Sequence, residues 1–186
     1  TGVKVHFEYD AAARLIAMQD NRGNRIEYDL DQLGNRKQTD VYDPEGNLVQ
    51  TQQALFDELG RLYTQLGAQS QPTDLRYDQS GNVTDITDAL SRQTTQQYDP
   101  LNRLIKTLDP DSNPVAYAYN DRNELTGVTD QRGNQTQYTY NAFGDVIQQD
   151  SPDTGITTYE YDLAGNLITE TNARNVKIDY TYDALN

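Results

Sequence analysis

The chain has 186 residues with a formal charge of −14, and only 35% of its residues are hydrophobic. That composition cannot fill a thick apolar core, although a sheet that buries one face requires less apolar surface. The excess of acidic over basic residues argues against nucleic acid as a partner. No apolar run is as long as the about 18 residues that a membrane-inserting span needs. Because the chain has no cysteine, it contains no disulfide and no thiolate metal site.

Residues 1–55 carry turn signals at uneven spacing. The aromatic–acid pairs of this segment are Tyr9-Asp10, Tyr28-Asp29 and Tyr42-Asp43. The glycines that punctuate it are Gly23, Gly34 and Gly46. We interpret the segment as irregular copies of one hairpin unit, with a turn after each aromatic–acid pair. The chain begins without an initiator Met and stops within a motif, so we expect it to be a piece of a longer protein.

Residues 56–186 repeat regularly, with four columns recurring every 21 residues. The aromatic column is Phe56, Tyr77, Tyr98, Tyr119, Tyr140, Tyr161 and Tyr182. The next residue forms an Asp or Asn column of Asp57, Asp78, Asp99, Asn120, Asn141, Asp162 and Asp183. Three residues later comes a Gly or Asn column of Gly60, Gly81, Asn102, Asn123, Gly144, Gly165 and Asn186. Two residues beyond lies a Leu or Val column of Leu62, Val83, Leu104, Leu125, Val146 and Leu167.

These columns have a physical logic that predicts a hairpin turn. An Asp or Asn side chain at the first turn position caps backbone N–H groups two residues on. Gly or Asn three residues later tolerates positive φ. The pairing suits a type I turn followed by a left-handed residue, a common hairpin connection. The Leu or Val column then starts the outgoing strand.

The segments between the turns alternate as strands do. Val115, Tyr117 and Tyr119 share one face, while Ala116 and Ala118 share the other. A second turn lies midway through each repeat, at residues 109–114, 130–134 and 151–155. Each repeat therefore supplies two strands of roughly six residues. We predict one all-β antiparallel meander over 1–186, irregular in 1–55 and regular in 56–186, with a longer loop at residues 69–72.

The motifs resemble a known family. YDLAGNL at residues 161–167 and GNQTQYTYNAFG at residues 133–144 are similar to the YD repeat of Rhs proteins. The resemblance covers essentially the whole chain. It implies a curved, spiralling β-ribbon that forms part of a hollow shell, as in bacterial Rhs toxins, insecticidal toxin complexes and teneurins. It also implies further YD repeats and an enclosed toxin domain as partners, and a secreted or cell-surface location. The acidic charge would suit a cationic cargo.

No residue pattern indicates chemistry. His6 is the only histidine, and we interpret it as a strand surface residue. The carboxylates fall mostly in the turn column, where a repeated structural role explains them. Asp43-Pro44-Glu45-Gly46 resembles a self-cleavage motif of bacterial shells but lies in an ordinary repeat turn. Oxygen ligands alternate at residues 109–113, yet Pro114 stands where a calcium loop needs Gly. We predict no enzyme activity, no catalytic or metal site and no cofactor.

Two further hypotheses concern surfaces. We expect the repeated tyrosines to stack on one another across strands. The alternative function is a carbohydrate-binding or adhesion module, in which exposed tyrosine rows stack on sugar rings. An open ribbon also has unpaired edge strands, which predicts self-association of the isolated fragment.

Overall fold

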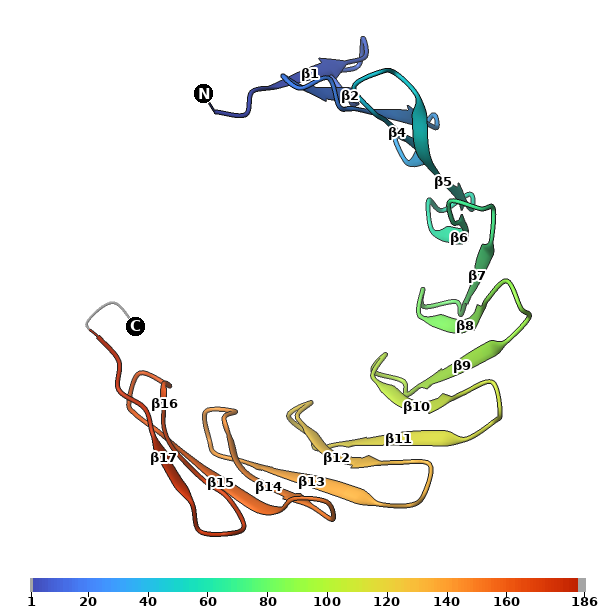
Figure 1. Ribbon diagram of the computed structural model, residues 1–186. Helices are drawn as coiled ribbons and strands as arrows, with labels where there is room; N and C mark the ends of the chain where they lie inside the picture. The colour runs from blue at the N-terminus through green and yellow to red at the C-terminus, as the bar shows by residue number, and fades with distance from the viewer. Residues whose placement is uncertain (1, 184–186) are drawn as a thin grey trace. The chain divides into compact units, whose positions relative to one another are not determined.

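The computed structural model describes residues 2–183, and in that part of the chain it contains seventeen strands and no helix (Figure 1). The prediction of an all-β fold is confirmed. The chain divides into two compact units, residues 1–94 and residues 95–186. In Figure 1 successive strands run back and forth within each unit, joined by short turns.

The strands of the N-terminal unit are short, five to nine residues each. They are β1 (Val5–Tyr9), β2 (Leu15–Asp20), β3 (Arg25–Leu30), β4 (Arg36–Tyr42), β5 (Leu48–Phe56), β6 (Leu62–Leu66), β7 (Pro72–Tyr77) and β8 (Val83–Thr87). From β1 to β8, each strand pairs antiparallel with its sequence neighbours within this set. This meander arises because two antiparallel strands need only a short turn between them.

The C-terminal unit continues the same pattern from β9 (Gln93–Tyr98), which begins just before the division. The remaining strands are β10 (Leu104–Leu108), β11 (Pro114–Tyr119), β12 (Leu125–Thr129), β13 (Gln135–Tyr140), β14 (Val146–Ser151), β15 (Gly155–Tyr161), β16 (Leu167–Thr171) and β17 (Lys177–Asp179). Antiparallel pairing again joins each strand to its sequence neighbour.

Neither unit has a thick core. Ala17 is the one buried hydrophobic residue found among the described residues, at 2% exposure. In the C-terminal unit the face that carries Tyr117, Tyr138 and Tyr159 is half-buried, while Gln137 and Thr139 on the opposite face are exposed. Backbone ladders and side-chain hydrogen bonds therefore carry much of the ordering that a core provides in other folds.

The prediction of a longer loop at residues 69–72 is wrong. The Gly67 N–H donates to the Gln71 carbonyl at 2.9 Å, and Ser70 takes the left-handed position with φ 59°. The Gln71 side-chain oxygen accepts from the Gln69 N–H at 3.1 Å and so replaces the missing aspartate cap. Pro72 opens β7, a position where a strand tolerates proline. The turn is thus an ordinary five-residue hairpin connection.

The turn predicted from Gly34 is confirmed, with φ 92° at that glycine, and Tyr28-Asp29 lies before this turn. Both residues belong to β3, which runs on to Leu30. The capping residue is Asp31, whose N–H donates to the Asn35 carbonyl at 2.9 Å. Asp31 supplies the capping carboxylate at the spacing from Gly34 that the turn requires, and its Oδ1 accepts from the Asn35 N–H at 2.8 Å.

Candidate functional site

The repeated feature of this protein is the five-residue connection that follows the aromatic column, here called the YD turn. Residues 162–166 illustrate it. The Asp162 N–H donates to the Asn166 carbonyl at 2.9 Å, and the Gly165 N–H donates to the Asp162 carbonyl at 3.1 Å. Gly165 has φ 84°. This is a type I turn followed by a left-handed residue, the geometry that the columns predict.

The first residue of the YD turn organises the turn through its side chain. Oδ1 of Asp162 accepts from the N–H groups of Ala164 and Asn166, both at 2.9 Å, and Oδ2 accepts from Asn166 Nδ2 at 2.9 Å. These hydrogen bonds, led by the one from the Asn166 side chain, hold the pKa of Asp162 below its usual value. The turn is therefore stabilised by the ionised carboxylate.

The fifth residue of the YD turn is a functional position that the column analysis missed. Where the first residue is Asp, the fifth is Arg or Asn, as in Asp99 with Arg103 and Asp162 with Asn166. Where the first is Asn, the fifth is an acid: Asn120 donates to Glu124. The signal was present in the sequence as a complementary pair four residues apart.

Five strand-end tyrosines tie their strands to the preceding hairpin. The hydroxyl of each donates to the backbone carbonyl of the Leu or Val fifteen residues earlier. The pairs are Tyr77 to Leu62 at 2.6 Å, Tyr119 to Leu104 at 2.9 Å, Tyr140 to Leu125 at 2.7 Å, Tyr161 to Val146 at 2.9 Å and Tyr182 to Leu167 at 2.8 Å. The Tyr98 hydroxyl donates to Gln96 Oε1 at 2.9 Å.

These hydroxyl bonds lie where backbone pairing between hairpins stops. Between β10 and β11 the register runs from Leu108↔Pro114 to Lys106↔Ala116 and goes no further toward the YD turns. The Leu104 carbonyl beyond that point accepts from Tyr119 instead. The tyrosine thus satisfies a backbone acceptor at the open end of the ladder.

The prediction that repeated tyrosines stack on one another is wrong for the tyrosines at the strand ends, which form the aromatic column. Tyr119 lies on β11 and Tyr140 on β13, with β12 between them. Two strand spacings separate them by about 10 Å, beyond the ~4.5–7 Å between stacked ring centroids. Each repeat contributes two strands, so the column cannot form direct cross-strand pairs.

Arginine at the fifth turn position connects successive YD turns. Arg103 Nε donates to Asp99 Oδ2 of its own turn at 2.7 Å, and its Nη1 donates to the Asn120 carbonyl of the next turn at 3.1 Å. Its guanidinium carbon lies 4.9 Å from the centroid of the Tyr119 ring. In the N-terminal unit Arg61 lies 4.6 Å from the centroid of the Tyr77 ring. The arrangement combines an ion pair, a carbonyl bond and a cation–π contact.

The predicted repeat residues occupy equivalent places in every described copy. The aromatic and the Leu or Val column face each other across a β-bulge, as Tyr77↔Val83, Tyr98↔Leu104, Tyr119↔Leu125, Tyr140↔Val146 and Tyr161↔Leu167. The caps are Asp78, Asp99, Asn120, Asn141 and Asp162. Positive φ is found at Gly81, Asn102, Asn123, Gly144 and Gly165. Asn186 lies outside the described residues.

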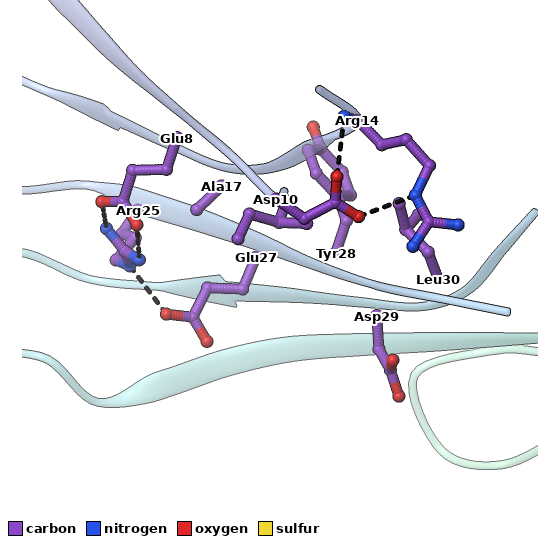
Figure 2. Close-up of a pocket in the computed structure, with 10 residues that line it drawn as sticks. Glu8, Asp10, Arg14, Ala17, Arg25, Glu27, Tyr28, Asp29 and Leu30 are labelled. Carbon is purple, nitrogen blue, oxygen red and sulfur yellow. Dashed lines mark hydrogen bonds and ion pairs between the residues drawn. The ribbon is translucent and has the colours of Figure 1, made fainter. Parts of the chain in front are cut away.

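A charged depression in the N-terminal unit contains the most conspicuous pair of carboxylates (Figure 2). Glu8 and Glu27 flank Ala17 across β1, β2 and β3. Arg25 bridges them, with Nη2 2.9 Å from Glu8 and Nε 2.7 Å from Glu27. The hydrogen bond from Arg25 lowers the pKa of Glu8. One guanidinium thus pairs with both acids, unlike the arrangement in which two carboxyl groups have different environments for acid–base catalysis.

The other chemical candidates have structural roles. His6 is exposed on β1. Asp109 caps its turn by accepting from the N–H groups of Asp111 and Asn113. Gly46 N–H donates to the Asp43 carbonyl at 3.0 Å in an ordinary turn. Within residues 2–183 no group of three or more His, Cys, Asp or Glu side chains is placed to hold a metal, and no helix there is long and apolar enough to cross a membrane.

Comparison with known proteins relates this geometry to a family. A family model described as Teneurin YD-shell matches residues 46–186. Curated protein sequences show no significant match. The chain is similar to a crystal structure of TcdB2-TccC3-Cdc42, with a TM-score of 0.70 and 16% identity, over 92% of this chain and 12% of that chain. A structure of TcdB2-TccC3 without its hypervariable C-terminal region gives a TM-score of 0.69 at the same identity and coverage. The chain thus spans about an eighth of the length of these structures and shares their fold.

Proposed function

The chain belongs to the teneurin YD-shell family and is a structural shell segment, and we propose that the wall to which it contributes encloses a toxin or another partner domain. The observation that carries this proposal is the repeated junction between successive hairpins, where a strand-end tyrosine bonds to the backbone of the preceding hairpin. The same hydroxyl bond recurs in copy after copy, from Tyr119 to Leu104 through Tyr161 to Val146. A repeated residue has a repeated role, and here that role is to join one hairpin to the next.

The proposed mechanism is steric. Each repeat adds two paired strands, and the tyrosine hydroxyl and turn arginine close the places where backbone pairing between hairpins ends. A wall built this way separates its contents from proteases and solvent. We propose that this segment performs no catalysis itself, that further YD repeats of the parent protein continue the wall, and that the protein acts outside the cell.

Protection from proteolysis tests this function in the full-length parent protein. With an intact wall, we expect an enclosed domain to resist trypsin under conditions that digest the same domain expressed alone. Replacing Tyr119, Tyr140 and Tyr161 together with Ala should open the wall and increase the digestion rate. Equal digestion in the intact and opened proteins would overturn enclosure. Glycan binding that is lost in Tyr161→Ala, with no protection of any domain, would favour the adhesion module instead.

A further inference from the structure

One junction between YD turns in the C-terminal unit has an acid at the fifth position of its first turn and no arginine in that turn. It lies between residues 141–145 and residues 162–166, where a groove is open to solvent. Six of the side chains that line this groove are Phe143, Asp145, Ile147, Tyr159, Tyr161 and Leu163. Phe143 is 91% exposed and Leu163 is fully exposed. The groove is therefore lined by apolar and aromatic side chains together with carboxylates.

Other junctions show which group belongs in such a groove. Arg103 places its guanidinium over the Tyr119 ring and against the Asn120 carbonyl. Arg14 likewise donates to the Asp31 carbonyl at 3.1 Å. Where Glu124 takes the fifth position, Arg122 supplies the cation instead and donates to the Asn141 carbonyl at 3.1 Å. In these junctions the chain itself directs a guanidinium at the first carbonyl of the following turn.

The groove between residues 141–145 and 162–166 has a tyrosine ring, a carboxylate and a turn carbonyl that could bind a guanidinium, but neither turn contains an arginine. Asp145 takes the fifth position, and Phe143 takes the place that Arg122 has in the preceding turn. Asp145 receives a hydrogen bond from Asn141 Nδ2 at 2.9 Å, and among the described residues no Lys or Arg forms an ion pair with it. Burial, followed by the charge of Asp145, raises the pKa of Tyr161, so this charge lies close to the ring.

We propose that this groove binds an arginine side chain presented by an extended segment of a partner protein. The guanidinium would lie over Tyr161, pair with Asp145 and donate to the Asp162 carbonyl, as Arg103 does toward Tyr119 and Asn120. Residues beside the arginine would be apolar and would cover Phe143 and Leu163, because exposed apolar side chains rimmed by polar groups mark interaction sites. The acidic charge of the chain favours approach of such a cationic segment.

Peptide titration followed by NMR of the uniformly ¹⁵N-labelled chain tests the proposal. The probe is the capped peptide Gly-Val-Arg-Val-Gly, and the matched peptide carries citrulline, which keeps the shape of arginine without its charge. We expect saturable shifts at the amides of residues 143–145 and 161–165 with the arginine peptide. Affinity for the citrulline peptide should be about tenfold or more lower, since a lost charge-assisted pair costs at least 1.4 kcal/mol.

Three variants sharpen the test. Asn141→Asp/Asp145→Arg builds the internal Asp–Arg pair of the other turns, so the groove is filled and peptide binding should be lost. Asp145→Asn removes only the charge and should weaken binding about tenfold, which keeps the test valid if the double variant fails to fold. Asp150→Asn raises the net charge by the same amount as the double variant but lies on the opposite face, so binding should persist.

Several results would overturn the proposal. Equal affinity for the arginine and citrulline peptides would show that the guanidinium is not recognised. Peptide binding retained in Asn141→Asp/Asp145→Arg would place the site elsewhere, and equal losses in Asp145→Asn and Asp150→Asn would indicate unspecific charge attraction. Groove shifts that appear on raising the chain concentration without peptide would identify a second copy as the occupant, against a partner protein.

Discussion

Asn141 donates from Nδ2 to Oδ2 of Asp145 at 2.9 Å, which reverses the roles found in the next turn, where Asn166 donates to Asp162 at 2.9 Å. Each of these turns thus contains one amide and one carboxylate, in either order. The backbone bonds of the turn are the same in both cases, because an amide oxygen and a carboxylate oxygen cap N–H groups equally well. The first and fifth positions of both turns are thus occupied by complementary side chains.

Exchanging the two residues tests this complementarity. Asn141→Asp alone places two carboxylates together and should destabilise the chain by about 1 kcal/mol. Asn141→Asp/Asp145→Asn restores one amide and one acid, so its unfolding midpoint in urea should return close to the wild-type value. A double variant as unstable as the single one would show that the identity of each residue matters more than the pairing.

Glycine at the left-handed turn position is required for its backbone conformation. Gly165 has φ 84°, and a Cβ added there would meet nothing within 4 Å. Gly165→Val should therefore cost about 1–2 kcal/mol through strain alone. Gly165→Asn should cost less, because Asn102 and Asn123 occupy the same position with positive φ. Thermal melting checks this.

Gly144 should behave in the same way, with Gln148 in the adjacent strand as the control site. Gly144 has φ 92°, so Val is strained there, whereas Gln148→Ala leaves a strand conformation that any residue adopts. Equal melting temperatures for the Gly144→Val, Gly165→Val and Gln148→Ala variants would contradict the turn assignment.

The tyrosine hydroxyl should contribute separately from the ring. Tyr161→Phe keeps the ring but leaves the Val146 carbonyl without its donor, so we expect a loss of about 1 kcal/mol. Tyr117→Phe is the control, since no hydroxyl bond of Tyr117 is found within the described part of the chain. Denaturant unfolding should separate the two variants. Equal stabilities would mean that solvent replaces the hydroxyl at no cost.

Stability should fall in acid because of the capping aspartates. Hydrogen bonds from the fifth residue and from turn N–H groups lower the pKa of Asp78, Asp130 and Asp162 in the folded chain. A depressed folded pKa stabilises the fold above the unfolded value of about 3.9, and this contribution is lost as the pH falls through the folded pKa. Unfolding free energy should therefore be level between about pH 5 and pH 7 and decline below about pH 4.

Asp162→Asn isolates the contribution of one cap. Asn keeps the capping oxygen, as Asn120 and Asn141 do, but does not titrate. The variant should therefore lose less stability than the wild type between pH 5 and pH 2. A steeper decline in the variant, or an ordinary pKa for Asp162 measured by NMR, would be incompatible with the cap's proposed role.

Local structure followed from the sequence alone. Tyr161, Asp162, Gly165 and Leu167 lie within seven residues, and their turn depends on φ, capping and alternation, which are properties of neighbouring residues. The prediction of a longer loop at residues 69–72 was wrong because the Gln71 side chain supplied the capping oxygen in place of an aspartate.

How the hairpins join depended on the assembled sheet. The bond from Tyr161 to the Val146 carbonyl and the contact of Arg103 with Asn120 connect residues 15 and 17 positions apart. These contacts depend on where backbone pairing between two hairpins ends, and strand register across a hairpin boundary follows from the assembled sheet. For the same reason Asp145 stands out only once the junctions are compared in space, because on the sequence it is one more acid in an acidic chain.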